Sequence, residues 1–136
     1  MGDKIKKPIV VFLSSPFTGL TDEELRDNHR NNVRELTDIV CKHYGVSDIK
    51  ILCAFENQDN FKHSDICKHK GLYYVGKYMS DFMSTCDVVV FGHNWRTSTG
   101  CVLEQYAASL YGLDYIDLDQ RNVYVHTNQK KGVYMA

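Results

Sequence analysis

Short apolar runs alternate with amphipathic stretches along most of this chain. The run at 8–13, Pro-Ile-Val-Val-Phe-Leu, is closed by the polar residues Ser14 and Ser15, and similar runs occupy 49–53 and 87–91. A continuous apolar run of this length is typical of a strand that is buried on both faces, the kind that parallel sheets contain. These three segments therefore predict a buried parallel sheet.

Helical patterns fill the segments between the expected strands. Thr21 and Glu24 have the spacing of a capping box, in which each side chain hydrogen-bonds the other residue's backbone at a helix start. Apolar side chains continue at helical spacing to Val40, and Gly45 is expected to end this first helix.

Two more helices are expected, over 72–86 and 102–110, with Gly112 ending the last of them. The first of these two carries an aromatic stripe made of Tyr74, Tyr78 and Phe82. The other is expected to face the sheet with Leu103, Ala107 and Leu110. The segment 54–76 is polar and less regular, and a loop this long in a small domain is often functional.

The order strand, helix, strand, helix, strand predicts an α/β fold, and two further short strands are expected at 115–118 and 122–126. We expect a small doubly wound sheet of parallel strands, Rossmann-like or flavodoxin-like, with right-handed crossovers and helices on both faces. The length suits a single domain over 1–136, in which 1–7 and 127–136 are expected to be loosely ordered tails.

Charge and hydropathy exclude several classes of partner. The formal net charge is -1 and the clustered lysines lie near the two ends, so no electrostatic footprint for a nucleic acid polymer is expected. No apolar run approaches the ~20 residues that span a bilayer, and no signal peptide is expected. The five cysteines are odd in number and widely spaced, which favours free thiols in the reducing cytoplasm.

Sequence signals for cofactors are missing as well. The Gly-x-Gly-x-x-Gly fingerprint of a dinucleotide site does not follow the first expected strand. His63, Cys67 and His69 lack the paired spacing of common zinc ligands. We therefore expect neither a metal nor an organic cofactor.

Two carboxylates are the candidate catalytic residues. Asp81 lies in the expected second helix, and Glu104 is expected in the first turn of the third helix, after a polar loop with Ser98, Thr99 and Gly100. Ligands of such folds bind at the carboxyl ends of the parallel strands, so both carboxylates can face one pocket. Paired carboxylates that flank an anomeric carbon are the usual catalysts of glycosidic-bond cleavage.

Other roles are open for these and neighbouring residues. Glu104 could favour a helix start through the helix dipole, and Asp81 could be an exposed polar residue. Asp87 begins a buried strand and is expected to be a structural hydrogen-bonding residue. Trp95 could stack on a nucleobase or pack beneath its loop, and Arg96 could pair with a phosphate or stay solvated.

Three blocks of the sequence resemble the nucleoside 2-deoxyribosyltransferase superfamily. They are Phe-Leu-Ser-Ser-Pro-Phe-Thr-Gly at 12–19, Tyr-Met-Ser-Asp at 78–81 with Cys-Asp-Val-Val-Val at 86–90, and Asn-Trp-Arg-x-Ser-x-Gly-x-x-x-Glu at 94–104. The resemblance covers roughly residues 8–116 and is greatest to a short branch common in phage and bacterial sequences. The chain is also similar to the branch that hydrolyses deoxynucleoside 5′-monophosphates.

The resemblance implies roles for individual residues. Glu104 would attack the anomeric carbon, and Asp81 would help to protonate the leaving base. Ser98 and the turn after the first strand would hold the sugar and a 5′-phosphate. With the loop residues that suit an anion or a base, the expected substrate-binding set is Ser14, Ser15, Pro16, Phe17, Thr18, Gly19, Trp95, Ser98, Thr99 and Gly100.

The expected function is therefore cleavage of, or base exchange at, the N-glycosidic bond of a nucleoside 5′-monophosphate or a deoxynucleoside. The alternative is a protein that binds a nucleotide or a nucleotide-derived signal without turning it over. Family members assemble as dimers or larger, which implies a homo-oligomer. Many members have tyrosine where this chain has Phe12, so a hydroxyl that positions the nucleophile would have to come from elsewhere, with Tyr73, Tyr74 and Tyr78 as candidates.

Overall fold

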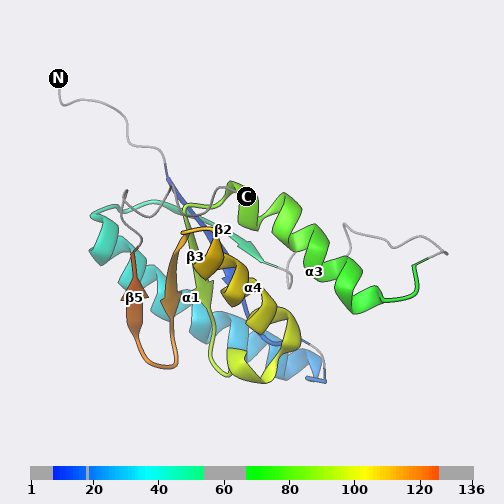
Figure 1. The fold of residues 1–136 in the computed structure, drawn as a ribbon. Coiled ribbons are helices and arrows are strands. Elements are labelled where there is room, and N and C mark those ends of the chain that lie inside the picture. Colours follow the sequence, from blue (N-terminus) through cyan, green and yellow to red (C-terminus); the bar gives the residue numbers. More distant parts are fainter. Residues whose placement is uncertain (1–7, 18, 54–66, 126–136) are drawn as a thin grey trace.

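The computed structural model of the protein describes residues 8–17, 19–53 and 67–125. Five strands form one sheet in the order β2-β1-β3-β4-β5 (Figure 1). Their bounds are Ile9–Ser14 for β1, Ile49–Cys53 for β2, Val88–Phe91 for β3, Asp114–Asp117 for β4 and Asn122–Tyr124 for β5. The first four strands run parallel, as the sequence predicts, and β5 pairs with β4 in the antiparallel direction.

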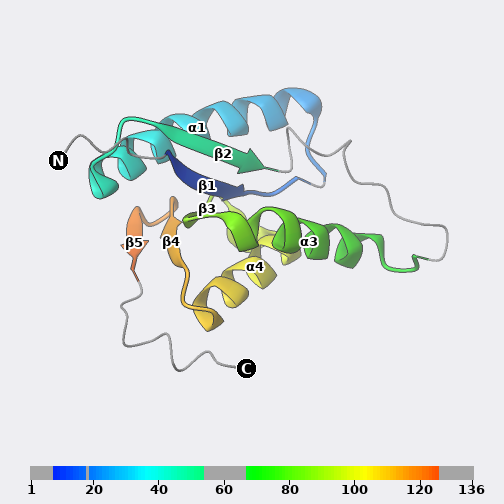
Figure 2. The same ribbon diagram turned by 90° about the horizontal axis from the view of Figure 1, so that it is seen from above.

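Helices cover both faces of this sheet, which confirms the expected α/β architecture. Helix α1 (Asp22–Tyr44) lies on one face, and α3 (Lys70–Asp81) and α4 (Thr99–Leu110) lie on the other, as Figure 2 shows. Two short 3-10 helices, η2 (Met83–Thr85) and η3 (Trp95–Thr97), precede β3 and α4. No helix in the described ranges is long and apolar enough to cross a membrane.

Each face of the sheet has its own core, because successive side chains of a strand point to opposite faces. Val11 and Leu13 of β1 pack against α1 through Leu36 and Val40. Phe12, between them in sequence, belongs to the opposite core. The members of that second core are Phe12, Met83, Val89, Phe91, Trp95, Cys101 and Ala108.

The capping box at the start of α1 forms as the sequence predicts. The Thr21 backbone N–H donates to Glu24 Oε1 over 2.9 Å, and the Glu24 N–H donates to Thr21 Oγ1 over 3.1 Å. Gly45 ends the helix with a left-handed backbone (φ 65°), which glycine adopts without steric cost. These two signals fix where α1 begins and ends.

The prediction for the last helix needs two corrections. Helix α4 begins at Thr99 rather than 102, because the Ser98 side chain caps it by accepting from the Cys101 N–H over 3.3 Å. Glu104 therefore lies in the second turn, and the expectation of a first-turn carboxylate is wrong. The buried face is also different: Leu103 and Leu110 are exposed, while the buried side chains are Cys101, Glu104 and Ala108.

Candidate functional site

A cleft of about 1000 Å³ opens at the carboxyl end of β1. From β1 the chain crosses to β2 on one side and later returns to β3 on the other, so this is the point at which the strand order reverses. Loops diverge at such a point and leave a crevice, the usual ligand site of open α/β sheets. The cleft is lined by residues 12–17, by the first turns of α1, by α3 as far as Tyr78, and by parts of 97–104.

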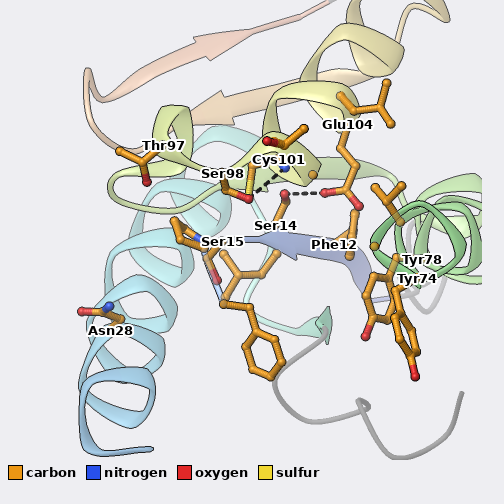
Figure 3. A pocket seen from close by; sticks show the side chains of 18 of the residues that line it. Phe12, Ser14, Ser15, Asn28, Tyr74, Tyr78, Thr97, Ser98, Cys101 and Glu104 are labelled. Atoms are coloured by element: carbon orange, nitrogen blue, oxygen red, sulfur yellow. Dashed lines mark hydrogen bonds between the residues drawn. The ribbon is translucent and has the colours of Figure 1, made fainter. Parts of the chain in front are cut away.

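A buried carboxylate and a buried hydroxyl meet in this cleft. Ser14, the last residue of β1, donates from Oγ to Glu104 Oε1 over 2.6 Å (Figure 3). Ser14 is 3% exposed and Glu104 is 4% exposed. Glu104 is therefore one of the few buried ionisable side chains of the described chain, and it lines a cleft rather than a closed core.

Burial gives this carboxyl group an unusual proton affinity. Removal from water raises the pKa of Glu104 to about 7, although the hydrogen bond from Ser14 acts in the opposite direction. A carboxyl group that titrates near neutrality can act as a base, an acid or a nucleophile under ordinary conditions. A perturbed carboxyl in a cleft is also a general marker of a functional site.

Aromatic side chains form one wall of the cleft. Phe12, Phe17, Tyr74 and Tyr78 line it, and the Tyr74 and Tyr78 rings are stacked with centroids 6.5 Å apart. Burial, with smaller contributions from Tyr74 and Glu104, raises the pKa of Tyr78, so its hydroxyl stays protonated at neutral pH. Figure 3 shows Phe12, Tyr74 and Tyr78 grouped on one side of the Glu104 carboxylate. Tyr73 is not among the described lining residues.

The structure brings most of the expected binding residues to the same cleft. The lining includes Ser14, Ser15, Pro16, Phe17, Ser98, Thr99 and Gly100. Gly19 is not among the described lining residues, and Thr18 lies outside the described residues. Asn28 and His29 of α1 also line the cleft, and no sequence signal beyond their helical position pointed to them.

Asp81 lies apart from this group. It is the last residue of α3, and its carboxylate pairs with Lys77 Nζ over 3.3 Å with 38% of the side chain exposed. The described lining residues from α3 end at Tyr78, one turn earlier. Asp81 therefore has the surroundings of a surface ion pair.

Trp95 packs beneath its loop, which was one of the two interpretations of the sequence. It is 6% exposed, its ring lies 5.1 Å from that of Phe91, and its Nε1 donates to Asp117 Oδ1 over 3.1 Å. Arg96 lies over the Trp95 ring, 4.4 Å from its centroid, and also pairs with Asp117. Neither Trp95 nor Arg96 is among the described lining residues, so the geometry offers no base stacking by this tryptophan.

Polar networks that the sequence did not predict hold the loops around the cleft. His93 hydrogen-bonds Glu35 of α1 through Nε2 over 2.8 Å and Asp119 through Nδ1 over 3.0 Å. Burial lowers the pKa of His93, but the two carboxylates outweigh this effect and raise it above the ordinary value.

Asp87, just before β3, accepts a hydrogen bond from the Val10 N–H over 2.8 Å, which confirms the structural role that the sequence predicts for it.

No metal-binding group of three His, Cys, Asp or Glu residues occurs among the described residues, and His63 lies outside them. Comparisons of the chain with protein-family models, with curated proteins and with solved structures found no match.

Proposed function

We propose that the protein cleaves or exchanges the N-glycosidic bond of a nucleoside or a nucleoside 5′-monophosphate, with Glu104 as the nucleophile. The observation that carries this proposal is the buried Glu104 carboxylate in the cleft at the carboxyl end of β1. An oxocarbenium-like transition state needs a negative charge close to the anomeric carbon, in a site that excludes water. The burial of Glu104 in this cleft supports that role.

The proposed reaction has two steps. One Glu104 oxygen forms a bond to C1′ while the C1′–N bond breaks, and the base leaves with the electron pair of that bond and takes up a proton. Water, or a second base, then attacks C1′, loses a proton to the solvent and releases the ionised carboxylate, which balances the proton that the leaving base took up from the solvent. The first step requires ionised Glu104, so base release is expected to rise with pH through about 7.

Two parts of the cleft suit the two ends of such a substrate. The aromatic wall of Phe12, Phe17, Tyr74 and Tyr78 suits a flat base, because aromatic faces contact bases through stacking and apolar burial. The first amides of α4, with Ser98 and Thr99, suit a sugar hydroxyl or a phosphate at a helix start.

The test is incubation of the wild-type protein with ribo- and deoxyribonucleosides and with their 5′-monophosphates, followed by chromatography for free base. We expect free base from at least one deoxynucleoside, or a new nucleoside when an acceptor base is added. No release from any member, combined with thermal stabilisation by one of them, would contradict the enzymatic proposal. That result would leave the alternative of a nucleotide-binding protein; a ligand at 100 times its dissociation constant stabilises by about 2.7 kcal/mol.

Asp81 provides a sharp prediction, because the resemblance gives it a catalytic role that its position does not favour. We expect Asp81→Asn to reduce the rate of base release less than about threefold. The free energy of unfolding should fall by less than about 1 kcal/mol, as is usual for the loss of an exposed ion pair. A loss of activity approaching that of Glu104→Gln would instead return Asp81 to the catalytic site.

We also propose that the protein assembles with copies of itself. The outer face of α4 carries exposed apolar side chains next to the cleft, namely Val102, Leu103, Tyr106 and Leu110. Light scattering is expected to give at least a dimer for the wild type and a smaller species for Tyr106→Glu combined with Leu110→Glu. A wild-type monomer at micromolar concentration would contradict this proposal.

The compartment that we propose is the reducing cytoplasm. All five cysteines lie in the described part of the chain, and none of them forms a disulfide there. Cysteines without disulfides are the rule where glutathione keeps thiols reduced.

A further inference from the structure

Glu104 receives its side-chain hydrogen bond from one residue of the described chain, Ser14, and this pairing is more than a packing contact. The two side chains come from elements 90 positions apart in the sequence and meet in the cleft. The resemblance at the sequence level gave Ser14 a different task, contact with the substrate. Its single hydroxyl proton is already committed to Glu104 Oε1 when that carboxylate is ionised.

The backbone of Ser14 is held by the neighbouring strand β3 and the residue that follows it. Ser14 is in register with Phe91 of the neighbouring strand β3, and its carbonyl accepts from the Gly92 N–H over 2.8 Å. A methyl group added to Gly92 would lie 2.5 Å from Asn32 Nδ2, so the chain packs tightly at this point. Because this backbone is held in place, the Ser14 hydroxyl can take only three staggered positions. In the observed one it reaches Glu104 Oε1, and it therefore serves as a rigid anchor.

Strand geometry also relates Ser14 to Phe12. Residues two apart on a strand point to the same face of the sheet, so Ser14 points to the face on which Phe12 joins the core beneath α3 and α4. Phe12 has no hydroxyl to offer Glu104. Ser14, two residues further along β1, provides a hydroxyl on this face, and that hydroxyl reaches Glu104 Oε1.

We propose, on the basis of the function proposed above, that Ser14 is the positioning residue for Glu104. It anchors Oε1 and leaves the second carboxylate oxygen to attack the anomeric carbon. Figure 3 shows this second oxygen directed away from Ser14, toward the side of Phe12 and Tyr78. Without the anchor, the carboxylate would rotate among several orientations, and few of them would place an oxygen in line with the bond that breaks.

The hydrogen bond also stabilises the ionised form of Glu104, because the serine donates to it. The other titratable groups that face Glu104 are Cys101 on α4 and Tyr78 on α3. Burial raises the pKa of each of them, so both remain neutral in the range in which Glu104 titrates. Loss of the Ser14 hydroxyl should therefore move the titration of Glu104 to higher pH.

The test compares Ser14→Ala, Ser14→Thr and Ser14→Cys with the wild type by two readouts. The first is the side-chain carboxyl NMR titration of Glu104 in the protein without substrate. We expect Ser14→Ala to titrate at higher pH than the wild type, and Ser14→Thr, which keeps the hydroxyl, to titrate like the wild type. Ser14→Cys keeps the volume with a weaker donor and should lie between them, so it can replace the alanine variant if that variant does not fold.

The second readout is the pH profile of base release. Ser14→Ala should lower kcat about 10- to 100-fold with little change in KM, and its acid limb should move to higher pH, while Ser14→Thr should recover most of kcat. Ser84→Ala, a serine-to-alanine change outside the cleft, is the matched control and should change neither readout. A rise in KM with kcat retained, or an unchanged titration of Glu104, would overturn the proposal. If the wild type released no base, the proposed function would fail, and the NMR titration would still decide whether Ser14 controls Glu104.

Discussion

Replacing Glu104 with glutamine is expected to lower the rate of base release by about 10³-fold or more at pH 8. An amide oxygen is a poor nucleophile, and glutamine carries no charge to stabilise an oxocarbenium-like state, so both contributions of the carboxylate disappear together. Glutamine has nearly the same shape, and its carbonyl oxygen can accept the hydrogen bond that Ser14 now donates to Oε1. The cleft should therefore keep its geometry while losing its reaction.

The matched control for this variant is Asp81→Asn, which makes the same chemical change at an exposed carboxylate. Initial rates of free-base formation, measured by chromatography at saturating substrate, separate the two. Equal rates for the wild type and Glu104→Gln would remove the nucleophile from the mechanism. Binding of substrate by Glu104→Gln, followed by thermal shift, should stay within a few-fold of the wild type, because the residue acts on the transition state.

The same substitution is expected to stabilise the fold at neutral and alkaline pH. Folding raises the pKa of Glu104 from its ordinary 4.5 to about 7, so the folded protein binds this proton more tightly than the unfolded chain does. The stabilisation from this proton is fully present below pH 4.5 and is lost as pH rises through about 7. Above that pH the wild type keeps a buried charge in its fold, and glutamine does not.

Urea unfolding at a series of pH values measures this effect. Glu104→Gln should exceed the wild type in unfolding free energy by about 3 kcal/mol near pH 8, since each pKa unit corresponds to about 1.4 kcal/mol. The difference should shrink toward zero by about pH 4.5, where both side chains are neutral. A variant that is less stable than the wild type at pH 8 would show that the charge supports the fold. Gained stability with lost activity is the signature of a residue kept for function.

Patterns local to one segment were readable from the sequence. The capping box at Thr21 and the left-handed stop at Gly45 each depend on a few neighbouring residues, and the structure confirms both. The apolar runs predicted β1, β2 and β3 to within one residue at each end. Each of these features is fixed by local sterics and burial, and so is visible in a short window.

The errors in the last helix have one physical cause. The pattern of apolar residues suggested that Leu103 and Leu110 face the sheet, but a polar side chain, Glu104, occupies that face. A hydropathy pattern assigns a carboxylate to the solvent side of a helix unless a partner is known. The partner here is Ser14, 90 residues earlier, and no local window contains both. The mismatch between pattern and burial is one of the reasons for which we propose a functional role for Glu104.

The Asp117 network could not be predicted for a similar reason. Asp117 is buried at the end of β4 and accepts hydrogen bonds from Trp95 and Arg96, which lie 22 and 21 positions earlier in the sequence. The sequence placed Trp95 and Arg96 beside the pocket, and it could not distinguish contact with a ligand from contact with Asp117. Only the register of β3 with β4 brings these groups together. The candidate carboxylate Asp81 is the last residue of α3, one turn beyond Tyr78, and it is not among the described lining residues of the cleft.

The most direct measurement of the central claim is mass spectrometry of the protein after rapid acid quenching during turnover of a substrate found in the nucleoside panel. The account predicts an intact species heavier than the free protein by one sugar unit. After digestion with trypsin, the sugar should be found on the peptide 97–121 and be localised by fragmentation to Glu104. The adduct should be missing from Glu104→Gln and should disappear when substrate is exhausted. Base released at the wild-type rate by Glu104→Gln, or an adduct on another residue, would contradict it.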